Sequence, residues 1–212
     1  MDRYEMMEKA RREGSKGLLM YLEAEEYGDN LALELGKKAG EERRKNIALQ
    51  GLTPEQAQQA LGYYREYFAD RGLYENELYP GIAELLRTLQ QAGYVLIVAT
   101  SKPEEFTHTI LRHFQLDSYF SFVGGNTLDE RRPTKAAVIA YIRERFPDIT
   151  GENTLMIGDR CYDIEGAHAC GLPAVGVLYG YGSRQELEAA GADELVQTPA
   201  ALLQSIRRRL PR

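Results

Sequence analysis

Six side chains that could hold a phosphate group or its metal ion lie at the ends of predicted strands or in the first turns of predicted helices. They are Thr100, Ser101, Lys102, Lys135, Asp159 and Asp163. Hydroxyl and ammonium groups bind phosphate oxygens, and carboxylates are ligands that Mg²⁺ prefers. Phosphoryl transfer depends mainly on positioning and on stabilising charge around the transferring group. This set of residue types therefore predicts a phosphate site with Mg²⁺ as its cofactor.

Each of these residues has a predicted role. We expect Thr100, Ser101 and Lys102 to bind the phosphate oxygens of a substrate. Lys135 is expected to act with Thr100 in catalysis, by neutralising phosphate and nucleophile charge together. It stands in the first turn of a predicted helix, where a cation opposes the helix dipole, so helix stability does not explain it. The two aspartates are one helical turn apart and are predicted to hold Mg²⁺.

Purely structural explanations exist for the same residues. Thr100 and Asp159 can cap the helices that follow them, Lys135 can be solvated, and Asp163 can favour a helix start. One such explanation is reasonable, whereas four at one edge of a sheet are a weaker explanation than a shared site. We therefore favour the shared site.

The elements that must position this site alternate regularly from about residue 79. Strands are predicted at residues 94–101, 120–124, 154–158, 174–179 and 194–196. Helices are predicted around residues 82–89, 106–114 and 134–146, then up to Cys170, from a cap at Ser183 and Glu186, and from Pro199. Unbroken apolar runs are typical of strands buried on both faces. The alternation indicates an α/β fold with a doubly wound parallel sheet, whose strand carboxyl ends collect the chemistry.

The residues before position 79 follow a helical pattern instead. Residues 54–70 place apolar side chains on one face, and Thr53, Pro54 and Gln56 form the start signal of a helix. We interpret the tyrosine-rich end of this segment as a packing surface. The chain is therefore divided into a helical region, 1–78, and an α/β core, 79–212.

Composition narrows the range of partners. The net charge is −6, with acidic and basic residues interleaved, so nucleic acid is not an expected partner. No apolar run reaches the length of about 20 residues that crosses a bilayer, so no membrane partner is expected and the location is predicted to be cytoplasmic. Cys161 and Cys170 have neither disulfide-framework nor metal-ligand spacing and are interpreted as reduced packing residues.

Residues from about 51 to 196 resemble the phosphoglycolate-phosphatase-like branch of the haloacid dehalogenase (HAD) superfamily, which includes relatives described as 5'-nucleotidases. The resemblance is carried by YENELYPG (74–81), VATSKP (98–103), TKAAVIAY (134–141), GDRCYDIEGA (158–167) and GVLYGYGS (176–183). It implies a Rossmann-like core, a helical cap that selects substrate, and a small phosphorylated metabolite as partner.

By the same resemblance, Thr100 takes the phosphate-binding role of the second family motif. Lys135 takes the role of the third-motif lysine, and Asp159 and Asp163 take the magnesium roles of the fourth motif. A response-regulator-like receiver domain also combines acidic residues with Thr and Lys, but the helical region before residue 79 and the GDRCYD segment favour the HAD resemblance.

The sequence departs from the family at its beginning. Such enzymes open with a buried strand that ends in an Asp-x-Asp-Gly-Thr motif, whose first aspartate attacks phosphorus. No aspartate of this chain has that context, and Asp2 and Asp29 lack both the strand and the motif. The fold is therefore expected to lack its usual first central strand, which lies between strands 94–101 and 154–158. The apolar residues 18–22 are interpreted as helix because their surroundings favour helix.

Three hypotheses on function remain open at this point. The first is an active phosphatase whose nucleophile lies elsewhere, and the second is a noncatalytic HAD-like protein that binds a phosphate-bearing ligand or a partner. The third is an incomplete or altered chain of an ordinary phosphatase, in which the opening strand was lost or replaced. We favour the third as origin, with weak or absent catalysis as its consequence.

Overall fold

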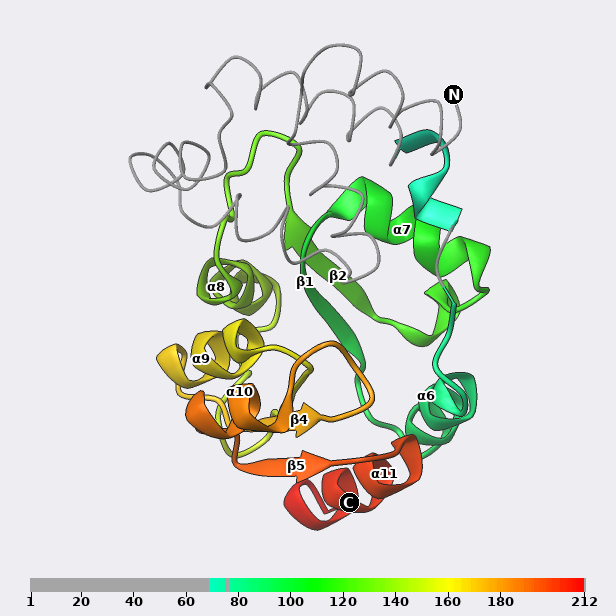
Figure 1. The fold of residues 1–212 in the computed structure, drawn as a ribbon. Coiled ribbons are helices and arrows are strands. Elements are labelled where there is room, and N and C mark those ends of the chain that lie inside the picture. Colours follow the sequence, from blue (N-terminus) through cyan, green and yellow to red (C-terminus); the bar gives the residue numbers. More distant parts are fainter. Residues whose placement is uncertain (1–68, 75–76, 212) are drawn as a thin grey trace, which may run out of the picture. The chain divides into compact units, whose positions relative to one another are not determined.

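The computed structural model describes residues 69–74 and 77–211, and the chain forms two compact units, Met1–Asn76 and Glu77–Arg212 (Figure 1). In the first unit the description covers the helical residues 69–70 and a short 3₁₀ helix, η1 (Gly72–Tyr74). The start signal at Thr53 and the predicted helix 18–22 lie outside the described residues. So does the predicted helix 54–70, apart from its last two positions.

The second unit contains the predicted alternation of helices and strands. Its elements are α6 (Ile82–Gln91), β1 (Ile97–Pro103), α7 (Glu104–His113), η2 (Asp117–Tyr119), β2 (Phe122–Asn126), α8 (Lys135–Arg145), β3 (Met156–Gly158), α9 (Cys161–Ala169), β4 (Ala174–Val177), α10 (Arg184–Ala189), β5 (Glu194–Val196) and α11 (Pro199–Arg209). Every strand and helix predicted after residue 79 is confirmed, with bounds that shift by a few residues. The largest shift is in β1, which begins and ends later than predicted.

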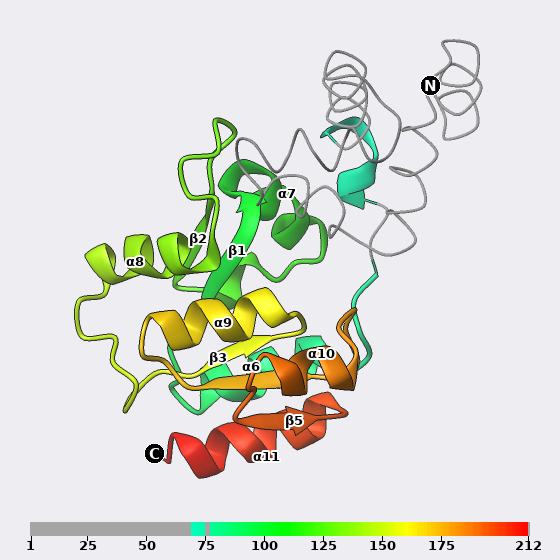
Figure 2. The same cartoon turned by 60° about the vertical axis from the view of Figure 1, so that its left-hand side comes forward.

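The strands form two parallel sheets, which confirms the α/β class with parallel strands. One sheet has the order β1-β2 and the other has the order β3-β4-β5 (Figure 2). Within the described residues, no strand pairs β1 with β3. The position expected for the first central strand of the family fold therefore lies between these two sheets.

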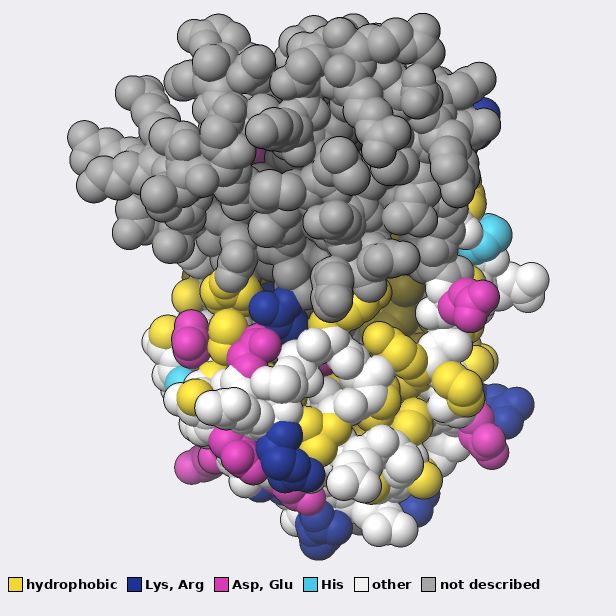
Figure 3. Space-filling model, viewed as in Figure 1, with side chains coloured by type: hydrophobic (Ala, Val, Ile, Leu, Met, Phe, Trp, Pro, Cys, Tyr) yellow, Lys and Arg dark blue, Asp and Glu magenta, His cyan; other side chains and the backbone are white. Residues whose placement is uncertain are grey.

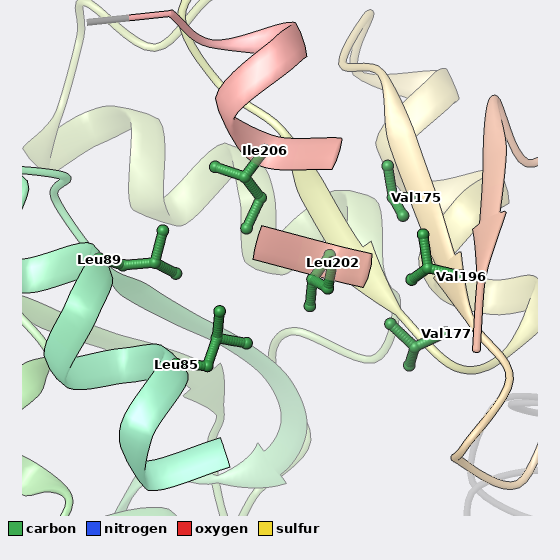
Figure 4. Packing of buried hydrophobic residues seen from close by; sticks show 7 residues of the cluster. All are labelled: Leu85, Leu89, Val175, Val177, Val196, Leu202 and Ile206. Carbon is green, nitrogen blue, oxygen red and sulfur yellow. The ribbon is translucent and has the colours of Figure 1, made fainter. Parts of the chain in front are cut away.

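Helices cover both faces of the three-stranded sheet. On one face, α6 and α11 pack with β4 and β5 through a cluster of buried side chains. These are Leu85, Leu89, Val175, Val177, Val196, Leu202 and Ile206 (Figure 4). On the other face, α8, α9 and α10 pack through Ile139, Ile164, Ala167, Leu172, Ala174 and Leu187. Strand β4 contributes alternate residues to the two clusters, which explains its unbroken apolar sequence.

Threonine side chains cap the starts of α8 and α11. The hydroxyl oxygen of Thr134 accepts a hydrogen bond from the Ala137 N–H at 3.1 Å, at the start of α8. Thr198 does the same for α11, where proline occupies the first turn. These hydrogen bonds satisfy backbone donors that a helix start leaves open, and the cap of α8 sets where Lys135 begins the helix.

The visible surface of the second unit carries charges of both signs. Figure 3 shows Lys and Arg side chains interspersed with Asp and Glu on the visible face of the second unit. Among residues 69–74 and 77–211, no helix combines the length and the apolar character needed to cross a membrane.

Candidate functional site

Lys135 is held in a buried position at the start of α8. Its side chain is 8% exposed, and its Nζ atom lies 2.9 Å from Oδ1 of Asp163 in α9. The same ammonium donates a hydrogen bond of 2.7 Å to the backbone carbonyl of Ala99 in β1. A buried ammonium is costly unless such partners compensate it. Lys135 therefore links the strand that carries Thr100 to the helix that follows Asp159.

The close packing of α9 against α8 makes this ion pair possible. Gly166 of α9 lies against Lys135, where an added Cβ atom would stand 2.5 Å from the Cβ of Lys135. A side chain at this position would push the two helices apart. Gly166, the second glycine of the GDRCYDIEGA segment, thus allows Lys135 to reach Asp163.

Asp163 also organises the turn that carries Asp159. Its Oδ2 atom accepts hydrogen bonds from the backbone N–H groups of Asp159 at 3.1 Å and Arg160 at 3.2 Å. The carboxylate therefore caps the start of α9, as the structural explanation proposed. One of its oxygens therefore caps the helix, and the other pairs with Lys135.

Asp159 follows directly after β3 and is enclosed by the loop between β4 and α10. Its Oδ2 atom accepts a hydrogen bond of 2.8 Å from the Tyr181 N–H, and its backbone carbonyl accepts one of 2.9 Å from the Gly182 N–H. The side chain stays partly exposed. Among the described residues, Oδ1 of Asp159 has no hydrogen-bond partner, so this oxygen can take a cation.

Thr100, Ser101 and Lys102 lie inside β1, because the strand continues to Pro103. The Thr100 hydroxyl accepts a hydrogen bond of 3.1 Å from the Lys102 N–H. The Ser101 hydroxyl is buried and has no hydrogen-bond partner within the described part of the chain. An unsatisfied buried hydroxyl costs about 1 to 3 kcal/mol, so a bound oxyanion that accepts its hydrogen bond would remove this cost.

Lys102 lies within electrostatic reach of both Lys135 and Asp159. Burial, assisted by the nearby charge of Lys135, lowers the pKa of Lys102 to about 8, while Asp159 opposes this shift. An anion bound beside the two lysines would relieve their mutual repulsion. The electrostatics of this edge therefore favour a bound anion.

Five residues near Asp159 were not predicted as site residues. They are Tyr79, Arg160, Tyr179, Tyr181 and Glu186. Arg160 Nε donates a hydrogen bond of 2.6 Å to Oε1 of Glu186, which also accepts one of 2.9 Å from the Cys161 N–H. The Tyr79 and Tyr179 rings meet edge to face, 5.5 Å apart. The sequence signal was the glycine-flanked YGYG segment after β4, a part of the family resemblance to which no role had been assigned.

Asp159 can contribute a carboxylate oxygen to a magnesium ion. Among the described residues, no group of three or more His, Cys, Asp and Glu side chains could hold a metal ion. Mg²⁺ often keeps several waters and binds one or two protein carboxylates together with substrate phosphates. Asp159, with its open Oδ1 atom, fits that mode. Both oxygens of Asp163 have partners in Lys135 and in the backbone before α9, and its magnesium role stays a prediction.

The two cysteines are free, as predicted. Burial, reinforced by Glu186, raises the pKa of Cys161 to about 11, so its thiol is protonated near neutral pH. A protonated thiol is a poor nucleophile. This protonation state does not favour Cys161 as a nucleophile.

Comparisons with known proteins agree with this geometry. Residues 19–177 match the family model described as haloacid dehalogenase-like hydrolase. A 5'-nucleotidase of Pseudomonas aeruginosa is 41% identical over 154 residues, which cover 73% of this chain and 69% of that protein. A crystal structure of a predicted phosphatase from Clostridium acetobutylicum matches with a TM-score of 0.71 and 42% identity, over 76% of this chain and 74% of that one.

Other relatives are matched over a smaller share of their length. The tyrosine-protein kinase PtkA of Mycobacterium tuberculosis is 36% identical over 74% of this chain. A phosphoglycolate phosphatase of Pseudomonas putida is 30% identical over 69% of it. In both cases the matched region spans 53% of the relative, about half of its length.

Proposed function

This chain belongs to the haloacid dehalogenase-like hydrolase family, and we propose that it binds small phosphate monoesters at the carboxyl edge of β1 and β3 but hydrolyses them only weakly. The family and its relatives support the phosphatase class. The observation that carries the proposal is the buried Lys135 ammonium, held by Ala99 and Asp163 beside Asp159.

Phosphate binding falls to the residues of β1 and to the two lysines. The Ser101 hydroxyl, which lacks a partner among the described residues, donates a hydrogen bond to a phosphate oxygen. Thr100 stands next to it on the strand and supplies a second hydroxyl. Lys102 and Lys135 balance the negative charge of the ester. Charge-assisted hydrogen bonds of this kind strengthen where water is excluded.

The proposed magnesium ion is held by Asp159 together with water and a substrate phosphate. When bound, it would neutralise charge on the phosphate oxygens. We assign Asp163 a positioning role in place of the metal-ligand role expected from its sequence. Its carboxylate fixes Lys135 and orients the backbone of Asp159.

Weak turnover follows from the sequence. The family mechanism needs an aspartate that attacks phosphorus, and no aspartate of this chain stands in the Asp-x-Asp-Gly-Thr context. The residues that remain bind and polarise the ester. By analogy with hydrolases that have lost their nucleophile, a rate about 10³ to 10⁴ times that of the uncatalysed reaction can survive.

The names of the relatives suggest the substrates to be tested. They are nucleoside monophosphates, after the 5'-nucleotidase, and phosphoglycolate, after the phosphoglycolate phosphatase. The assay measures phosphate release and, by calorimetry, the affinity for each ester with Mg²⁺ present. We expect binding that Lys135→Ala weakens at least tenfold, since a charge-assisted contact contributes about 1.5 to 3 kcal/mol, with release near background.

Metal binding is tested separately. Asp159→Asn should weaken Mg²⁺ binding measured by calorimetry. Asp117→Asn is the control and should leave it unchanged, because Asp117 is an exposed residue of η2, before the amino end of β2 and away from the proposed site. An unchanged Mg²⁺ affinity in Asp159→Asn would show that the metal assignment is wrong. Rapid Mg²⁺-dependent hydrolysis that is abolished by Asp2→Asn or Asp29→Asn would contradict weak turnover and identify the nucleophile.

A further inference from the structure

Three tyrosines gather around Asp159. The backbone N–H of Tyr181 lies 2.8 Å from Oδ2 of Asp159. Tyr79 meets the ring of Tyr179 edge to face, with an angle of 67° between the ring planes. Burial and then the charges of Tyr181 and Asp159 raise the pKa of Tyr79, so its hydroxyl lies within the electrostatic reach of both. Tyr79 and Tyr179 are in ring contact, and Tyr181 follows Tyr179 by two residues on the loop bonded to Asp159, so the three residues are named here the tyrosine platform.

Two members of the tyrosine platform remain open to solvent. Tyr181 is 57% exposed and Tyr79 is 41% exposed, and both rank among the large exposed hydrophobic residues. Tyr179 is partly buried and contacts Tyr79 edge to face. Packing of the core therefore does not account for the outer rings, because much of their surface stays in water.

The tyrosine platform lies on the same side of the structure as the proposed phosphate site. Tyr181 and Tyr179 belong to the loop that follows β4, and this loop encloses Asp159 through hydrogen bonds from Tyr181 and Gly182. A phosphate ester held beside Asp159 and Lys135 would have this loop as a neighbour. The loop that carries Tyr179 and Tyr181 therefore borders the proposed phosphate site.

We propose that Tyr79 and Tyr181, supported by Tyr179, determine specificity by stacking on the leaving group, and that they select phosphate esters of planar aromatic rings over esters of small aliphatic alcohols. Aromatic faces prefer offset or edge-to-face contact with other rings, and such contacts are favourable beyond the area that they bury. A two-carbon alkyl group covers less of either ring. This inference rests on the proposed function, because it needs the phosphate to be anchored at Asp159 and Lys135.

The test measures affinity by calorimetry on the full chain with Mg²⁺ present. The ligands are inorganic phosphate, phenyl phosphate and ethyl phosphate, which share the phosphate and differ in the leaving group. We expect the wild-type chain to bind phenyl phosphate about three- to tenfold more tightly than ethyl phosphate. Tyr181→Leu should bring this ratio close to one, because leucine keeps apolar area but removes the ring.

A matched control separates the tyrosine platform from tyrosine loss in general. Tyr119→Leu removes a partly buried tyrosine in η2, before the amino end of β2, and should keep the wild-type ratio. Tyr79→Leu serves as a second platform variant, with thermal unfolding followed for each protein. A reduced ratio in both platform variants supports the proposal.

The possible outcomes separate the role of the tyrosine platform from the proposed function. If the wild-type chain binds inorganic phosphate but binds the two esters equally, or if both platform variants keep the preference, the tyrosine platform has no role in specificity while the proposed function stands. If inorganic phosphate and both esters fail to bind, the proposed function is wrong and this inference falls with it.

Discussion

At the residue scale, Lys135 has a broader role than its sequence position indicated. It was predicted as a cation for phosphate and nucleophile charge. The structure adds two partners, the Ala99 carbonyl at 2.7 Å and the Asp163 carboxylate at 2.9 Å. The Ala99 carbonyl belongs to β1, which is not paired with β3. The lysine thus supplies a hydrogen bond to a strand edge as well as charge to the site.

The first prediction concerns the Lys135–Asp163 ion pair. Lys135→Met should lower the free energy of unfolding by about 3 to 5 kcal/mol, because it leaves a buried carboxylate without its cation. Once Asp163→Asn has neutralised that carboxylate, Lys135→Met should cost less, so the double variant should lose less stability than the sum of the single losses. Urea unfolding of the four proteins measures this coupling. Strictly additive losses would contradict a coupled pair.

The second prediction concerns pH. Because the pKa of Lys102 is lowered to about 8, its side chain is cationic below that pH and neutral above it. Esters such as ethyl phosphate have a second pKa near 6 and keep their charge above pH 7. We therefore expect the affinity for ethyl phosphate to fall about tenfold between pH 7 and pH 9. Calorimetry across this range should give a flatter profile for Lys102→Met, and an equally steep one would exclude Lys102 as the titrating group.

At the element scale, the loop between β4 and α10 connects two helix starts. The Ser183 hydroxyl caps α10 by accepting the Glu186 N–H, as its sequence predicted. The Glu186 carboxylate, however, contacts the start of α9, because it accepts hydrogen bonds from the Arg160 side chain and from the Cys161 N–H. The local pattern correctly marked a helix start, but it did not show that Glu186 stabilises a second helix distant in sequence.

The third prediction tests this contact between helices. Glu186→Ala should lower the free energy of unfolding by about 1 to 2 kcal/mol, because it leaves the Cys161 N–H and the Arg160 guanidinium without an acceptor. Glu186→Gln should recover part of the loss. The matched control is Glu188→Ala on the same helix, where an exposed pair with Arg184 contributes less than about 0.5 kcal/mol. Equal losses at both positions, measured by urea unfolding, would contradict the cap.

At the scale of the whole molecule, the separation of the two sheets is the main feature. Strands β1 and β2 pair with each other, β3 pairs with β4, and the described residues place no strand between β1 and β3. Helices α8 and α9 link the two sheets through Lys135 and Asp163. Unpaired backbone groups at buried strand edges are costly, so an additional strand at this position would be stabilising.

The fourth prediction uses this position. Replacing residues 1–12 with an apolar strand that ends in Asp-x-Asp-Gly-Thr should add a strand between β1 and β3. The chimera should have a higher midpoint of urea unfolding and should release phosphate well above the rate of the original chain, because it regains the nucleophile. The same graft with Asn as the first acidic residue should keep the gain in stability and lose the gain in rate. A chimera without either gain would contradict the proposed strand position.

The sequence alone was sufficient to predict the α/β class and the order of elements after residue 79, and it also named the candidate phosphate-binding residues. These depend on local signals, which are apolar runs for strands, the cap at Ser183 and Glu186, and polar residues that follow strand segments. Such signals act over a few residues, so they can be recognised without the tertiary fold.

Only the tertiary structure decided how these residues are used. The strands form two sheets, and the two oxygens of Asp163 bind Lys135 and the backbone at the start of α9. Tyr79 contacts Tyr179 and lies within electrostatic reach of Asp159. Each of these features depends on contacts between groups far apart in the sequence. The free energy of such contacts comes from burial, pairing and charge in three dimensions, which no local pattern of residues encodes.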